Sequence, residues 1–381
     1  MYFQDEYLRP GWKSETVTQM KRFAEENREY LTDCNRRAHF PRELYREMGR
    51  RGWVGPVTPV EEGGLGGGVN EYCLIEEEVG RLGLVPPQVS VQGQLWLLSW
   101  GSQAQKDQYL RGIARGEVIF CEAISEPGVG SSLKAMKATA RRDGSDWILD
   151  GQKTHVNLGH QADVMIVYAM AQEGLTSFLV DACENGISTR QTNPIGYRLI
   201  PTAEIELNSV KVPDSALLGG PGEGLKTFLS TFNTSRLGNA SELIGYGRRA
   251  LAEAIAYAEQ RQVGEDARVV DFQGIQWTVA DCYAELYAAS LARDHAALLI
   301  DQGKDHSLET TLAKKLAVDA AEKAANECFA LIGGYGLYEE TPFEQILCDI
   351  KVLRVAGGSL EVLRNYLARR VLESDDYEGL G

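Results

Sequence analysis

The stretch that decides the fold runs from Phe120 to Ala169 and reads FCEAISEPGVGSSLKAMKATARRDGSDWILDGQKTHVNLGHQADVMIVYA. A loop rich in Gly, Ser and Pro (Ser125–Ser132) follows a short apolar run. Two β-type runs come next, Trp147–Leu149 and Val164–Tyr168, separated by turn-forming residues. Segments with helical periodicity lie on both sides. A small β layer between two helical blocks, with a glycine loop at its edge, predicts a cofactor-binding site.

The bulk composition is that of a folded protein with two or three subdomains. The chain has 381 residues, of which 44% are hydrophobic and 24% charged. The formal net charge of −15 argues against a nucleic-acid backbone or an anionic membrane as the main partner. Seven scattered Cys without a Cys-x-x-Cys motif indicate reduced thiols in a cytoplasmic protein. We expect no signal segment, no membrane span and no metal site, because no matching pattern occurs.

Along the chain, helical periodicity gives way to short strands and then returns. Strands with short polar connections favour an antiparallel barrel or sandwich over a parallel dinucleotide fold. The predicted class is α+β, with an N-terminal helical domain (1–117), a middle antiparallel β-barrel or sandwich domain (118–222) and a C-terminal four-helix bundle (223–381). The bundle helices are expected at 225–260, 270–303, 307–332 and 343–372, the last one interrupted at Gly357-Gly358.

Several motifs in order resemble those of the acyl-CoA dehydrogenase family. They are FPRELYREMGRRGW and PVTPVEEGGLGGG within 40–68, SEPGVGSS at 125–132, LDGQKTHVN at 149–157, ADVMIVYA at 162–169, VVDFQGIQWTVAD at 269–281, and LIGGYGLYEETP through CDIKVLRVAGGSLEVLR at 331–364. The resemblance covers essentially the whole chain. It implies the family fold, FAD held between the β domain and the bundle, an acyl thioester of CoA or of a carrier protein as substrate, and a homotetramer or homodimer.

The SEPGVGSS loop is the first candidate flavin contact. A flavin ring needs backbone N–H groups and short hydroxyl side chains close to it, which Gly130, Ser125 and Ser131 supply. The other reading of this loop is a surface turn. The resemblance places His155 where the family has an aromatic over the ring, and Asn157 where it has Thr or Ser. His155 is therefore an altered flavin contact, or a candidate catalytic residue that exchanges a proton near the ring.

The remaining candidate FAD contacts follow from the resemblance and depart from its pattern. In the family an arginine motif binds the pyrophosphate of FAD. Here that motif reads RQVG, so Arg261 or Arg268 is expected to bind the pyrophosphate, next to Phe272. The family normally has a Gln three residues before the glycine pair that is Gly333-Gly334 here, and this chain has Ala330 at that position. The other expected contacts lie in the glycine pair and near the chain end: Gly333, Gly334, Ser359 and Glu361.

The substrate end is expected at Asn233, Ser235 and Arg236, although Arg236 can also be read as a surface arginine with a packed stem. The family's general base is a Glu at one of two positions, and these hold Gly357 and Ser235 here. The first has no side chain, and a serine hydroxyl is too weak a base to remove an α-proton at neutral pH. The identity of the base stays open.

The leading hypothesis is an FAD-dependent oxidoreductase acting on an acyl thioester, with a base from elsewhere or with an unusually acidic substrate. A second hypothesis is redox-neutral elimination from an acyl-CoA, as in desulfinase-like relatives that share the Gly-Gly loop. A third is a non-catalytic subunit that forms a hetero-oligomer with an active paralogue.

Overall fold

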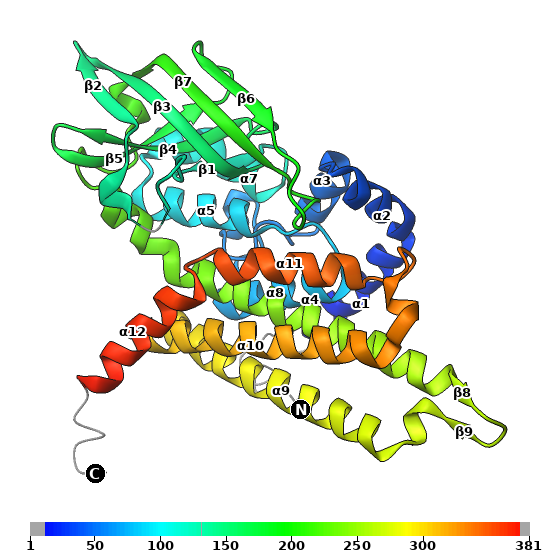
Figure 1. The fold of residues 1–381 in the computed structure, drawn as a ribbon. Coiled ribbons are helices and arrows are strands. Elements are labelled where there is room, and N and C mark those ends of the chain that lie inside the picture. The colour runs from blue at the N-terminus through cyan, green and yellow to red at the C-terminus, as the bar shows by residue number, and fades with distance from the viewer. Residues whose placement is uncertain (1–11, 131, 374–381) are drawn as a thin grey trace. The chain divides into compact units, whose positions relative to one another are not determined.

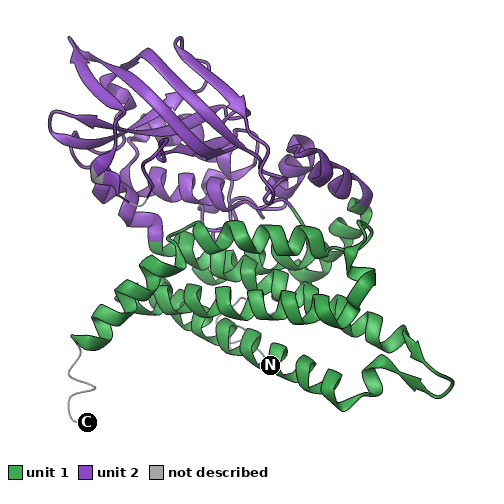
Figure 2. Cartoon of the chain, viewed as in Figure 1, with its two compact units in different colours: residues 1–28, 69–84, 233–381 green, residues 29–68, 85–232 purple. Residues whose placement is uncertain are grey.

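The computed structural model describes residues 12–130 and 132–373. Two compact units divide the chain (Figure 2). Unit 1 comprises residues 1–28, 69–84 and 233–381, and unit 2 comprises residues 29–68 and 85–232. Each unit is assembled from segments that are far apart in the sequence. The domain boundaries drawn from the sequence stay a prediction.

Unit 2 is built on a mainly antiparallel seven-stranded sheet with the order β1-β4-β2-β3-β7-β6, in which β5 pairs with β4 (Figure 1). Its first strand, β1, runs parallel to β4. Residues 203–207 and 210–212 belong to a single strand, in which a bulge opposite Asp150 lies between them. The strands are β1 (Phe120–Ala123), β2 (Thr139–Asp143), β3 (Asp146–Asn157), β4 (Val164–Ala171), β5 (Gly174–Asp181), β6 (Ile187–Gln191) and β7 (Thr202–Pro213).

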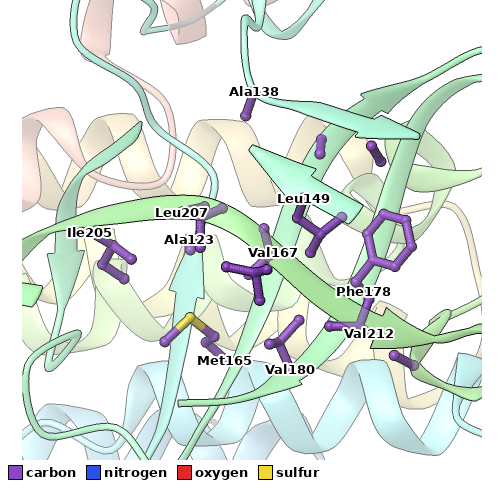
Figure 3. Close-up of a cluster of buried hydrophobic side chains, with 14 of the residues drawn as sticks. Ala123, Ala138, Leu149, Met165, Val167, Phe178, Val180, Ile205, Leu207 and Val212 are labelled. Atoms are coloured by element: carbon purple, nitrogen blue, oxygen red, sulfur yellow. The ribbon is translucent and has the colours of Figure 1, made fainter. Parts of the chain in front are cut away.

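Strand β4 is buried on both faces, which explains its continuous apolar run. Met165, Val167 and Ala169 point into a core shared with the other strands (Figure 3). The alternate residues Val164, Ile166 and Tyr168 pack in a second core with Trp96 and other helical residues. Side chains alternate between the faces of a strand, so a strand between two cores must be apolar at every position.

Among the helices of unit 2, α5 and α7 supply residues to the second core of the sheet. Helix α3 ends just before Gly52, whose φ of 81° suits glycine as a helix terminator. A π-helical turn at Lys106–Leu110 joins α6 to α7. The helices are α2 (Arg28–Arg37), α3 (Arg42–Arg50), α5 (Gln88–Trp100), α6 (Gln103–Gln105) and α7 (Arg111–Ala114).

Unit 1 is helical, and the expected break at Gly357-Gly358 separates its last two helices. Glycines allow α4 and α8 to approach closely: a Cβ on Gly245 would lie 2.2 Å from the Glu77 carbonyl oxygen. Glu77 also forms ion pairs with Arg248 and, at 2.9 Å, with buried Arg293, which tie α4 to α8 and α9. The elements are α1 (Trp12–Glu26), α4 (Val69–Leu82), α8 (Gly224–Gln260), β8 (Gln262–Val263), β9 (Ala267–Arg268), α9 (Gln273–Asp301), α10 (Ser307–Ile332), α11 (Phe343–Val355) and α12 (Leu360–Leu372).

Among the described residues, the helices are all too short or too polar to cross a lipid bilayer.

Truncating the sheet core should destabilise the protein strongly. Phe178 is fully buried and packs edge-on against Trp147, with the ring centroids 5.3 Å apart. Phe178→Ala should lower the free energy of unfolding by about 3–5 kcal/mol, because it leaves a cavity in a close-packed core. Urea denaturation measures the change. Ile195→Ala, at a residue that is 70% exposed, is the matched control and should change stability by less than about 0.5 kcal/mol.

Candidate active site

In unit 2 a buried ion pair fixes the SEPGVGSS loop against β3. The Lys153 ammonium lies 2.8 Å from a carboxylate oxygen of Glu126, and the two side chains are 0% and 3% exposed. The backbone N–H groups of Lys137 and Ala138 also donate to Glu126, at 2.6 and 2.9 Å. One further bond, from the Thr154 N–H to the Ser125 carbonyl at 2.9 Å, places Ser125 beside the end of β3. The loop therefore has a fixed position relative to His155 and Asn157.

The carboxylate of Glu126 is held in its charged form. Burial by itself would raise its pKa, but the hydrogen bonds from Lys153 and from two backbone amides outweigh burial and lower the pKa below the usual value. Burial also lowers the pKa of Lys153, and the contact with Glu126 opposes that shift. Each buried charge therefore depends on the other.

His155 lies at an irregularity of β3 where the backbone is strained. The pairing of β3 with β7 shifts register between Lys153 and Val156, and His155 has a φ of 56°. Its side chain is exposed. Leu158, three residues on, also has a positive φ, 58°. Residues without glycine's freedom occupy this region at a cost of about 1–3 kcal/mol each, and such strain concentrates at functional sites.

The loop presents bare backbone on its open side. Gly128 has a φ of 78°, and a Cβ placed on Gly128 or Gly130 would meet no atom of the described residues within 4 Å. A ligand can thus approach the main chain here without obstruction from side chains, which fits the close contact that a flavin ring needs. Ser131 lies outside the described residues.

In unit 1 the residues expected at the substrate end converge on the loop between α11 and α12. Arg236 donates from Nε to the Gly357 carbonyl at 3.2 Å. From Nη1 it donates to Asn233 at 3.2 Å and to Thr311 at 3.0 Å. Ser235 is buried one residue earlier on α8. Arg236 is therefore a partly buried positioning residue for this loop, and the surface-arginine reading does not describe it.

Gly357 adopts a backbone conformation that suits glycine. Its φ is 71° and that of Gly358 is 96°. A Cβ at Gly357 would lie 2.4 Å from Nδ2 of Asn239, which is below any ordinary contact. A larger side chain at this position would therefore need both a strained backbone and a displaced Asn239.

Lys314 is a titratable group held next to the same loop. It is fully buried on α10, and its ammonium donates to the carbonyl of Leu353 at 2.7 Å, near the end of α11. Burial lowers its pKa to about 7, an effect that nearby Glu242 opposes and Arg236 reinforces. Lys314 can therefore exchange a proton near neutral pH.

The residues expected at the pyrophosphate lie around the β8–β9 hairpin. Arg261 precedes β8 and is exposed, Arg268 forms an ion pair with Asp271 at 3.3 Å, and Phe272 is 48% exposed. Tyr257 of α8 stacks on Tyr335, with centroids 5.7 Å apart. This stack brings the end of α8 next to the turn that contains Gly333 and Gly334.

Ser359 and Glu361 lie at the start of α12, directly after the Gly357-Gly358 loop. Ser359 is the N-cap residue, and its carbonyl accepts from the Leu363 N–H at 3.1 Å. Glu361 is exposed and lies 3.5 Å from Arg354. Both residues are held near the candidate substrate end of unit 1.

Sequence reasoning missed the buried polar residues that organise the site. Lys153 follows Leu149 at a spacing of four on β3, so strand alternation alone places it on the inward face. Asn239 lies four residues after Ser235 on α8, which places both on one helix face. No motif marks Lys314 or half-buried Glu122. The Oε1 atom of Glu122 has no hydrogen-bond partner among the described residues, and burial raises its pKa to about 8.

Comparison with known proteins agrees with this arrangement. Three family profiles match in order: acyl-CoA dehydrogenase, N-terminal domain, at residues 13–117, middle domain at 121–210, and C-terminal domain at 222–372. The chain is 33% identical over 364 residues to a 3-(aryl)acrylate reductase of Clostridium sporogenes, covering 92% of this chain and 96% of that one. It is 32% identical to the mitochondrial short-chain specific acyl-CoA dehydrogenase of Bos taurus, covering 88% and 84%.

Solved structures show the same fold. A glutaryl-CoA dehydrogenase from Mycobacterium smegmatis in complex with FADH2 superposes with a TM-score of 0.90 at 27% identity, covering 98% of this chain and 99% of that one. The chain belongs to the acyl-CoA dehydrogenase family, whose members are flavoenzymes that bind FAD. The expected fold class, an N-terminal helical domain, a middle β domain and a C-terminal helical domain, is confirmed.

The Glu126–Lys153 pair should stabilise the fold at neutral pH and lose that effect in acid. Lys153→Met should lower the free energy of unfolding by about 3–5 kcal/mol, because it leaves a buried carboxylate without its counter-charge. Because folding lowers the pKa of Glu126, its contribution is complete above the ordinary carboxyl pKa and is lost as the pH falls through the lower folded value. Urea denaturation of the wild type and Glu126→Gln should thus give a stability difference that shrinks as the pH falls from about 5 to 3. A difference independent of pH would contradict this account.

Proposed function

We propose that this protein is an FAD-dependent oxidoreductase that acts on an acyl thioester of CoA or of a carrier protein without a carboxylate at either family base position. The observation that carries the proposal is the combination of a preserved flavin-loop scaffold with an altered base position. Glu126 and Lys153 hold the loop in unit 2. At the substrate end of unit 1, Gly357 and Ser235 offer no carboxylate.

The chain's own residues have separable roles in this proposal. Ser125, Gly130, Ser131 and Asn157 bind the flavin, and His155 contacts its ring. Arg236 positions the loop at Gly357 through its carbonyl contact, and Asn233 supports Arg236. The bound flavin supplies hydride transfer at the β-carbon of the acyl group.

Proton transfer at the α-carbon needs a group other than residue 357. Lys314 is the titratable side chain that supports this part of the proposal, because it is held against α11 and its pKa is about 7. The similarity to a reductase of 3-(aryl)acrylates adds support for the reverse direction. In that direction the α-carbon receives a proton, so the group placed there acts as a general acid in place of a base.

Two alternatives each have a specific observation in their favour. Redox-neutral elimination is favoured by the missing carboxylate at Gly357, where an uncharged amide, Asn239, fills the adjacent space. The role of a non-catalytic subunit is favoured by an ion pair at the β8–β9 hairpin. Arg268, whose guanidinium was expected to bind the FAD pyrophosphate, is paired with Asp271 instead.

We also propose a cytoplasmic homotetramer or homodimer. Support for self-association comes from α9, which exposes large aromatic side chains: Trp277 is 62% exposed and Tyr283 58%. Large apolar side chains exposed along one helix are typical of interaction surfaces.

The flavin spectrum tests the proposed function. Protein purified with added FAD should be yellow. On anaerobic mixing with saturated acyl-CoAs it should lose its flavin absorption, or the dithionite-reduced protein should regain it with 2,3-unsaturated acyl-CoAs. The absence of bound flavin would exclude the oxidoreductase and support the subunit role. Conversion of an acyl-CoA while the flavin stays oxidised would instead support elimination.

Restoring a carboxylate at residue 357 alone should not raise activity. Gly357→Glu should destabilise the protein by about 1–3 kcal/mol, because φ at 357 is positive and Asn239 occupies the space of the new side chain. Thermal unfolding and the rate of flavin reduction by butyryl-CoA measure the two effects. Val355→Ala, two residues away at a side chain that is 66% exposed, is the stability control. A stable Gly357→Glu variant with faster flavin reduction would contradict the described geometry.

A further inference from the structure

Asn239 is an uncharged polar side chain that is buried without any partner of its own. It is 0% exposed on α8. Neither Nδ2 nor Oδ1 has a hydrogen-bond partner among the residues that the structure describes. A buried amide satisfied on neither side costs about 1–3 kcal/mol for each group, so native proteins rarely keep one without a reason.

The amide of Asn239 points at the bare side of Gly357. Its Nδ2 lies 2.4 Å from the place where a Cβ of residue 357 would stand. The loop itself is fixed, because Arg236 holds the Gly357 carbonyl and is held in turn by Asn233 and Thr311. Asn239 therefore occupies space that a side chain at residue 357 would otherwise fill, within a scaffold that is already hydrogen-bonded.

Nearby buried polar residues of α8 have hydrogen-bond partners, which Asn239 lacks within the described part of the chain. Ser241 donates to the carbonyl of Leu237 at 2.8 Å. The Tyr246 hydroxyl lies 3.0 Å from Glu242 and 2.8 Å from Asp349. These neighbours of Asn239 on α8 therefore have partners for their side-chain polar atoms, whereas both polar atoms of the Asn239 amide have none among the described residues.

We propose that Asn239 is a specificity-determining residue that hydrogen-bonds a hydroxyl substituent on the acyl group of the substrate. This inference rests on the proposed function. The amide offers one kind of donor and one acceptor, and a hydroxyl group can accept from Nδ2 while it donates to Oδ1. A plain hydrocarbon chain in the same place would leave both amide groups unsatisfied, and sites built this way reject the ligand that lacks the polar group.

An uncharged substituent fits better than a carboxylate. An anion buried here would need a counter-charge, and the amide of Asn239 supplies none, while Nε and Nη1 of Arg236 are directed at Gly357, Asn233 and Thr311. The amide cannot serve as the missing base, because it does not take up a proton at neutral pH. Asn239 therefore selects and orients the substrate, and proton transfer belongs to another group.

Calorimetric titration of the FAD-loaded protein with matched ligands tests the inference. The probes are butyryl-CoA, 2-hydroxybutyryl-CoA, 3-hydroxybutyryl-CoA and succinyl-CoA, the last carrying a carboxylate. At least one hydroxyl-bearing ligand should bind about 10-fold or more tightly than butyryl-CoA. Asn239→Leu, which has a similar shape without polar atoms, should remove that preference and tighten butyryl-CoA binding. Ser241→Ala, whose hydroxyl bonds within the helix, is the matched control and should keep the wild-type preference.

The outcomes separate this inference from the proposed function. Equal wild-type affinities for butyryl-CoA and both hydroxylated ligands would overturn the role of Asn239 and leave the acyl-CoA function standing. So would tightest binding of succinyl-CoA, or a preference that survives in Asn239→Leu. If the FAD-loaded protein binds none of the four ligands, the proposed function fails and the inference fails with it. Because the wild-type comparison is decisive alone, a variant that does not fold leaves the test intact.

Discussion

The candidate flavin site depends on one buried ion pair. Lys153 and Glu126 hold each other inside unit 2, and two backbone N–H groups complete the coordination of the carboxylate. Because two buried charges tolerate little displacement, they fix the SEPGVGSS loop against β3. The positions of Ser125, of the glycines and of the strained His155 all follow from this attachment. The pair contributes no chemistry itself, yet it determines where the groups that contact a flavin can lie.

The second constraint, in unit 1, is that the Asn239 side chain lies where a side chain of residue 357 would otherwise extend. The Gly357-Gly358 loop takes a left-handed backbone, Arg236 fixes it through a carbonyl, and the uncharged amide of Asn239 lies where a side chain of residue 357 would extend. The absence of a side chain at residue 357 is therefore matched by its neighbours, since Asn239 and Arg236 are placed to fit glycine there. A change at residue 357 alone does not reverse such an arrangement, because the neighbours are packed to suit glycine.

The sequence predicted much of the fold because the fold rests on local patterns. The helices of unit 1 carry long apolar stripes, Gly52 ends α3, and the break at Gly357-Gly358 appears where expected. The parallel pairing of β1 with β4 was not expected, because strand direction depends on how distant segments meet. Periodicity indicated that β4 is apolar throughout, but only the packing showed that two separate cores require it.

The residues of the candidate site also divide into those that the sequence identified and those that only the structure revealed. By itself the sequence determined the family, a candidate flavin loop with Ser125 and Gly130, and the absence of a carboxylate at Gly357 and Ser235, because each of these is a matter of residue identity in an ordered motif. The tertiary structure decided that Lys153 is a buried partner of Glu126, that Lys314 lies against α11, and that Asn239 is left without a partner beside Gly357. Burial and partnership are properties of residues brought together from distant positions, and they set the pKa values and the unsatisfied hydrogen bonds on which the chemistry depends.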